Sequence, residues 1–210
     1  KFIDERGKAP DFWAREAKKR SWSVWNSDPW DNDYRQSAKP VREQTEAVGH
    51  AVRAVYLYTG MADLAAETEV HRKMYITGGI GSTVQGEAFT VDYDLPPDTA
   101  YSETCAAIGL IFFAEKMLEN EINGEYGDVM ELVFYNTVLA GMQLDGKRFF
   151  YVNPLEVDIG ISGKACTHSH VLSSRPKWYA CACCPPNAAR LIGSIGKYAY
   201  GEKGDTAYCH

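Results

Sequence analysis

Two short runs of the sequence hold the side chains best able to do chemistry. The first is Glu103-Thr104-Cys105 in "YSETCAAIG", and the second is the "CACC" run at 181–184 in "WYACACCPPN". Each run lies where a helix is expected to begin. The free N–H groups and partial positive charge of a helix N-terminus lower the pKa of a thiol, so that thiolates become available as metal ligands or nucleophiles.

The two runs together supply three sulfurs and one carboxylate oxygen, from Glu103, Cys105, Cys183 and Cys184. Such a set suits a tetrahedral Zn²⁺ ion. Residues i and i+2 of a regular helix diverge, so Glu103 and Cys105 can reach one ion only if a helix begins around them. We expect Ser102 to cap that helix.

The same cysteines allow other interpretations. Taken singly, Cys105 is a small core residue and Glu103 is an acid favoured by the helix dipole. Disulfides are a second option for the six cysteines, but adjacent Cys183 and Cys184 pair poorly with each other. A metal site in a reducing, cytoplasmic compartment is therefore favoured.

Two rival functions also follow from these residues. A structural zinc in a protein-interaction domain would keep all four ligands closed and would need no substrate pocket. A thiol redox protein would use Cys181 and Cys184 as a CxxC pair, although no thioredoxin-like βαβ pattern surrounds them.

Composition narrows the class of partner. The chain has 210 residues, of which 45% are hydrophobic and 12% aromatic, enough to bury a core as one domain or a large part of one. A formal charge of -6 without any Lys/Arg-rich run argues against binding to nucleic acid or anionic lipid. The longest apolar run, "AAIGLIFF", is far shorter than the roughly 18–20 residues of a membrane span, so we expect a soluble protein.

Both ends of the chain look cut. It opens with "KFIDERGKAPDFW" without an initiator Met, and it stops at "GDTAYCH", which is typical of the first half of an alternating strand. We expect residues 1–210 to be part of a single domain that is truncated at both ends.

Hydrophobic spacing predicts a mainly α fold. Residues 72–101 are rich in Gly, Pro and Asp, which indicates a long functional loop. "KRFFYVNPLEV" and "RPKWYACA" are expected to be strands or extended segments. Helices are expected over Glu43–Glu67, from Ser102 to about Asn123, over about Tyr126–Ala140, and from Pro185 to Tyr200.

Five motifs give the sequence a specific resemblance. "MYITGGIGS", "GEAF", "YSETCA", "FYNTVLAG" and "CCPPN" occur in the order seen in glycoside hydrolase family 127, and the match covers nearly the whole chain. The chain thus resembles the β-L-arabinofuranosidases of that family. The resemblance implies an (α/α)6 barrel of which these residues supply the later helices, with a shortened stretch between Thr68 and Glu69.

The resemblance also implies a retaining mechanism that acts on arabinofuranosides, and a related hydrolase acting on another pentose is the alternative. A zinc-bound cysteine matching Cys183 would be the nucleophile, and the glutamate of "GEAF", Glu87, would be the acid/base. A homodimer of the full-length protein is compatible with this assignment. The remaining zinc ligands would be Glu103, Cys105 and Cys184, and the sugar-binding positions would be His50, Glu131 and Tyr151.

Several of these residues have plainer interpretations. His50 lies in the middle of the predicted first helix among apolar residues, where a core histidine is as reasonable as a sugar contact. Glu131 shares a helical face with aromatic residues, which favours a pocket. A further group of ligand types without a matching family role, expected in a solvent-facing loop, consists of Cys166, His168 and His170.

Overall fold

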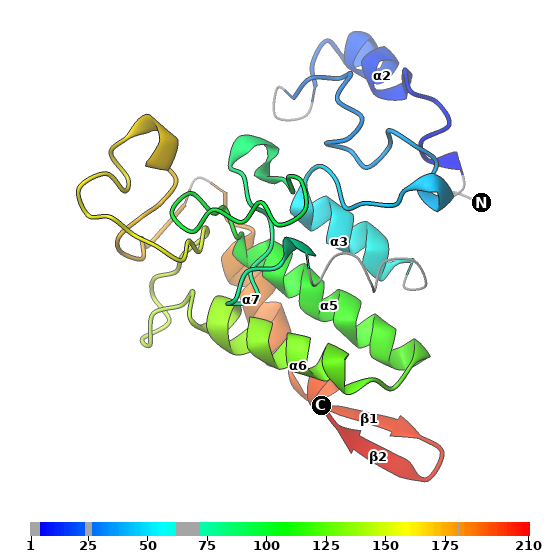
Figure 1. The fold of residues 1–210 in the computed structure, drawn as a ribbon, viewed down its shortest axis with the longest axis vertical. Helices are drawn as coiled ribbons and strands as arrows, with labels where there is room; N and C mark the ends of the chain where they lie inside the picture. The colour runs from blue at the N-terminus through cyan, green and yellow to red at the C-terminus, as the bar shows by residue number, and fades with distance from the viewer. Residues whose placement is uncertain (1–4, 24–26, 62–71, 180) are drawn as a thin grey trace.

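The computed structural model describes residues 5–23, 27–61, 72–179 and 181–210, and it is mainly helical, as expected (Figure 1). The (α/α)6 barrel stays a prediction. The longer helices are α2 (Phe12–Arg20), α3 (Ala51–Thr59), α5 (Thr104–Asn120), α6 (Gly124–Val133) and α7 (Cys184–Gly193). The shorter elements are η2 (Val41–Glu43), η3 (Gln85–Glu87), η5 (Cys166–His168), α8 (Gly196–Ala199), and the π-helix η4 (Phe134–Leu139), which continues α6.

Helix α5 forms the centre of the core. Most of its residues are buried on every side, because α3 and α6 flank it and α7 packs on it as well (Figure 1). Gly109 allows the closest of these contacts, since a Cβ there would lie 2.4 Å from Val55 Cγ2 on α3. The start of each of these helices is thereby fixed relative to the others.

The helix predicted over Glu43–Glu67 begins later than expected. Gly49 has a φ of +72°, and a Cβ on it would lie 2.0 Å from the carbonyl oxygen of Asp33. The chain therefore turns at Gly49, and α3 begins at Ala51 with His50 at its N-cap. Residues 62–71, which include the predicted end of this helix and the Thr68–Glu69 junction, lie outside the described residues.

The expected Ser102 cap is wrong by one residue. Ser102 has a φ of +41° and is buried, and its side chain fills the space above Gly79. Glu103 takes the N-cap position of α5 instead. The first amide of the helix, that of Thr104, donates to the carbonyl oxygen of Tyr151 (3.0 Å).

The C-terminal strand is confirmed, but its partner was not foreseen. β1 (Tyr200–Lys203) pairs antiparallel with β2 (Thr206–Cys209), so the helix predicted through Tyr200 stops one residue earlier, after a break between α7 and α8. The segments around "KRFFYVNPLEV" and "RPKWYACA" are mostly irregular, with isolated bridges such as Glu103–Val152. Within the described ranges, every helix is too short or too polar to cross a membrane.

The long loop over residues 72–101 is confirmed and lies over the starts of α3 and α5 (Figure 1). It is tied to both. The Phe89 amide donates to the carbonyl of Gly49 (2.9 Å), and the Ser102 amide donates to the carbonyl of Gly81 (2.8 Å). These bonds hold η3, and with it Glu87, above the helix starts.

Candidate active site and metal centre

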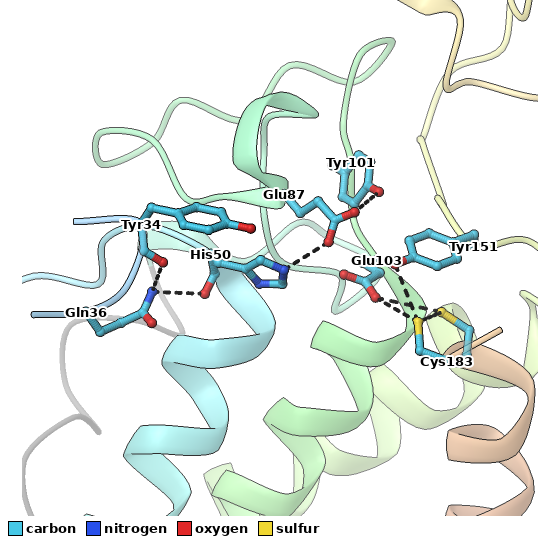
Figure 2. A network of polar contacts seen from close by, with 9 residues as sticks. Tyr34, Gln36, His50, Glu87, Tyr101, Glu103, Tyr151 and Cys183 are labelled. Carbon is cyan, nitrogen blue, oxygen red and sulfur yellow. Dashed lines mark hydrogen bonds and ion pairs between the residues drawn. The ribbon is translucent and has the colours of Figure 1, made fainter. Parts of the chain in front are cut away.

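The starts of three helices meet at one cavity. His50, Glu103 and Cys183 are the N-cap residues of α3, α5 and α7. Figure 2 shows them together with Glu87 from the loop above and Tyr151 from the irregular segment beside α5. The cavity has a volume of about 550 Å³, and Cys105 also lines it. Residues predicted from five separate parts of the sequence therefore share one site.

The four predicted metal ligands converge. One ligand atom from each of Glu103, Cys105, Cys183 and Cys184 lies within 4.8 Å of the others. Cys183 Sγ is 3.6 Å from Cys184 Sγ and 3.5 Å from Glu103 Oε1, and Cys184 Sγ is 3.9 Å from the same oxygen. All six cysteines are free thiols, so the disulfide interpretation is not supported.

These distances fit a metal ion. Zinc bonds of about 2.3 Å to sulfur and about 2.0–2.1 Å to oxygen, arranged as a tetrahedron, separate two sulfurs by about 3.7 Å and a sulfur from an oxygen by about 3.5 Å. Glu103 is only 3% exposed, and its Oε2 has no hydrogen-bond partner. Burial, followed by the charges of Glu87 and Cys183, raises the pKa of Glu103 to about 9. A buried carboxylate of this kind is stabilised as an anion by a cation beside it.

The start of α7 suits a reactive thiol. Pro185 and Pro186 have no amide hydrogens, so two helix-start donors that would otherwise lack partners are absent. Cys184 is buried and turned into the core, whereas Cys183 is only half-buried and lines the cavity. The two adjacent sulfurs therefore differ in access, and only Cys183 is open to a molecule in the cavity.

Glu87 is held firmly at the top of the cavity. Its backbone φ is +52°, an unusual value for a residue other than glycine, and it follows Gly86 in η3. The Tyr101 hydroxyl donates to Oε1 (2.7 Å), and His50 Nε2 lies 2.9 Å from Oε2. Burial acts to raise the pKa of Glu87, but the hydrogen bonds from His50 and Tyr101 outweigh it and lower the pKa below its ordinary value.

Tyr101, which positions this carboxylate together with His50, was not foreseen from the sequence. Tyr101 lies two residues before Glu103, but Ser102 between them has a φ of +41°, so the alternation of an extended segment does not place the two side chains. Asn153 holds the segment in place, because its Nδ2 donates to the carbonyl of Ser102 and to Thr104 Oγ1, each at 2.9 Å. The local sequence does not predict these two hydrogen bonds, because they join residues about fifty positions apart.

Aromatic rings form the walls of the cavity. Tyr151, a predicted sugar-binding residue, is buried and stacks on Tyr179 with centroids 4.6 Å apart, and its hydroxyl lies 3.4 Å from Cys183 Sγ. The opposite wall has Tyr34, with the guanidinium of Arg53 4.6 Å from its ring centroid. Tyr34 and Arg53 were also missed, because neither belongs to a motif.

Glu131 is not brought to this site. It is exposed on α6, whose buried residues Met130 and Val133 belong to the core around α5, and it does not line the cavity. The apolar side of α6 is occupied by the core, and Glu131 lies away from it.

The Cys166, His168 and His170 group does not converge either. His168 Nε2 lies 3.1 Å from Asp98 Oδ2, whereas His170 Nε2 lies 3.0 Å from the carbonyl oxygen of Thr99. Cys166 is exposed, as expected for a surface loop, but His170 is buried. Ligand atoms of these three residues do not form a cluster in the part of the chain that the structure describes.

The sequence of this chain is similar to those of known glycoside hydrolases. Residues 1–197 match the family described as the β-L-arabinofuranosidase GH127 catalytic domain. The chain belongs to glycoside hydrolase family 127. The "non-reducing end beta-L-arabinofuranosidase" of Bifidobacterium longum subsp. longum is 44% identical over 233 aligned positions, which cover 100% of this chain and 34% of that protein.

Solved structures of family 127 enzymes have the same fold. The crystal structure of a GH127 β-L-arabinofuranosidase from Geobacillus stearothermophilus T6 superposes with a TM-score of 0.91 at 49% identity, covering 100% of this chain and 35% of that one. A second GH127 β-arabinofuranosidase gives a TM-score of 0.77 at 40% identity, covering 99% of this chain and 30% of that one. This family 127 chain therefore spans about a third of the length of the relatives it matches.

Proposed function

We propose that the protein containing this chain is a retaining hydrolase that releases L-arabinofuranose from β-L-arabinofuranosides. The single observation that supports this most is the shared cavity, where the half-buried Cys183 sulfur and the Glu87 carboxylate are both accessible in a family 127 chain. A closed structural metal site in a protein-interaction domain would not leave one ligand sulfur facing a cavity.

Zinc is the ion that we propose for the sulfur-rich cluster. Three thiolates and one carboxylate are a donor set that zinc prefers over magnesium or calcium. When bound, zinc keeps a coordinated thiol deprotonated, which supplies a nucleophile at neutral pH. Glu103, Cys105, Cys183 and Cys184 would hold it.

The residues of the cavity account for a two-step reaction. Cys183 Sγ attacks the anomeric carbon, and the bond to the aglycone oxygen breaks as that oxygen takes a proton from Glu87. Glu87 then removes a proton from water, the water oxygen attacks the same carbon, and the carbon–sulfur bond breaks to restore the thiolate. His50 and Tyr151 would contact the sugar. Glu131 is left without a part in this scheme, because it lies outside the cavity.

The direct test is a set of nitrophenyl glycosides given to the full-length parent protein. We expect hydrolysis of the β-L-arabinofuranoside and little or none of the α-L-arabinofuranoside. Proton NMR during the first turnovers should show the β anomer of the sugar before mutarotation, since two displacements at one carbon retain configuration. Release of the α anomer first, or no activity on any pentofuranoside, would reject the proposal.

Metal content tests the ligand set independently of activity. We expect about one zinc per chain in purified protein, measured by atomic emission, and loss of most of it when Cys105 and Cys184 are both changed to Ala. Changing the exposed Cys166 and Cys209 to Ala together is the matched control and should leave the zinc content unchanged. A folded protein without zinc, or full zinc retention in the Cys105/Cys184 variant, would contradict the assignment.

A further inference from the structure

A second set of ligand atoms lies directly beside the sulfur-rich cluster. One atom each from His50, Glu87 and Glu103 also lies within 4.8 Å of the other two. Glu103 belongs to both sets and lies between them in Figure 2. Its Oε1 faces the sulfurs of Cys183 and Cys184, whereas its Oε2, buried and without a hydrogen-bond partner, is on the side of His50 and Glu87.

We propose that His50 Nε2, Glu87 and Glu103 Oε2 form a second, weaker site for a divalent transition-metal ion, joined to the first site through the Glu103 carboxylate. One imidazole nitrogen and two carboxylate oxygens are a set that Zn²⁺ and Co²⁺ accept. A carboxylate can bridge two metal ions about 3.5–4 Å apart, as in two-metal hydrolase sites.

The His50–Glu87 separation is already close to the one that an ion needs. His50 Nε2 and Glu87 Oε2 are 2.9 Å apart, and two ligands with bonds of about 2.0–2.1 Å in a tetrahedron are separated by about 3.3 Å. The pair must therefore open by only a few tenths of an ångström. The third ligand is already buried and unpaired, so no hydrogen bond is lost when it binds.

Charge favours a second cation and also limits its affinity. A zinc ion held by three thiolates and a carboxylate has an overall negative charge, to which ionised Glu87 adds another. The positive guanidinium of Arg53, which lies over Tyr34 and also lines the cavity, opposes the binding of a second cation. His50 Nδ1 has no partner among the described residues, so the imidazole lacks the supporting hydrogen bond that strong zinc sites provide. We expect the second ion to bind more weakly than the first for these reasons.

Occupation of this site would inhibit the proposed reaction. The second ion would bind the Glu87 carboxylate oxygen that otherwise donates a proton to the leaving group and accepts one from water. This consequence, unlike the site itself, rests on the proposed function. Hydrolysis should therefore fall in step with binding of the second equivalent, and Mg²⁺ at the same concentration should have no effect because it prefers an oxygen-only, octahedral set.

The test uses the full-length protein already holding one equivalent of zinc. Zn²⁺ is added in equilibrium dialysis, and the bound metal is counted. We expect a second equivalent in the unmodified protein and at least about tenfold weaker binding of it in Glu87→Gln and in His50→Gln. The matched control is Asp98→Asn, which breaks another His–carboxylate pair, with His168, outside the cavity and should bind the second equivalent normally.

Cobalt gives a second measurement on unmodified protein, so the outcome does not depend on the folding of the variants. Co²⁺ added to the zinc-loaded protein should produce weak d–d bands without a new thiolate-to-metal charge-transfer band. A charge-transfer band would overturn the proposal, because the added ion would then be on sulfur. Binding of one equivalent only, or an unchanged second equivalent in both variants, would overturn it as well. An active protein that binds one equivalent only shows failure of this inference without failure of the proposed function. A protein that binds two equivalents but is already inactive with one equivalent bound shows the reverse.

Discussion

Changing Cys183 to Ala in the full-length protein should lower kcat on nitrophenyl β-L-arabinofuranoside by about 10⁴-fold or more, the scale seen when an enzyme loses its covalent nucleophile. The reason is geometric as well as chemical. Cys183 is the sulfur of the adjacent pair that faces the cavity, whereas Cys184 is buried against the core. The adjacent Cys184 is therefore not positioned to replace it.

The matched control for this variant is Cys181→Ala. Cys181 lies two residues away, is more exposed, and lines the same cavity, but it is not part of the converging ligand set. We expect this variant to keep its activity within a few-fold. Zinc content must be measured for both variants, because Cys183→Ala removes a proposed ligand as well as the nucleophile.

Covalent trapping separates these two effects. A sugar-shaped electrophile, such as an arabinofuranose-configured epoxide, should label the unmodified protein once, and peptide mass spectrometry should find the adduct on Cys183. Labelling of a carboxylate would return the enzyme to the two-carboxylate scheme of most glycosidases. Labelling of Cys181 would show that exposure, and not placement at the start of α7, determines which thiol reacts.

The metal ligands could be foreseen because their chemistry is local. Glu103 and Cys105 share a helix start, and Cys183 with Cys184 share another, so residue type and capping position were enough to propose one cluster. The helices themselves were foreseen for the same reason. α5, α6 with η4, and α7 all have the spacing and end signals that define helices in isolation.

Contacts between distant segments account for what the sequence did not reveal. The start of α3 is set by the close approach of Gly49 to the backbone of Asp33. His50, predicted in the middle of a helix, therefore lies at the N-cap of α3 and contacts Glu87. Tyr101 acquires its role only because the loop brings Glu87 above it. β1 is different, since the Gly204-Asp205 turn after it was a readable hairpin signal.

Changing Glu87 to Gln should have an effect that depends on the leaving group. Glu87 is the only carboxylate between Glu69 and Asp92, and it is held by His50 and Tyr101 over the cavity. Loss of a general acid typically costs about 10²–10⁴-fold, and we expect a loss of that order for an alkyl or hydroxyproline-type aglycone. A nitrophenolate leaves without protonation, so the first step with that substrate should suffer far less. Glu202→Gln, the same chemical change on the exposed strand β1, should leave both substrates unaffected.

Azide distinguishes an acid/base from a positioning residue. In Glu87→Gln the thioglycosyl intermediate on Cys183 should accumulate with the nitrophenyl substrate, because water lacks its general base. Azide needs no deprotonation, so it should speed turnover and yield a β-configured glycosyl azide, since attack on the intermediate is a second inversion at the same carbon. The two donors on Glu87 favour its ionised form, which is the form that accepts a proton from water in the second step. An equal loss with both kinds of leaving group and no response to azide would instead make Glu87 a residue that holds His50 and Tyr101 in place. Another carboxylate of the parent protein would then have to supply the acid/base, and Glu131→Gln, although Glu131 lies outside the cavity, would be the next variant to test.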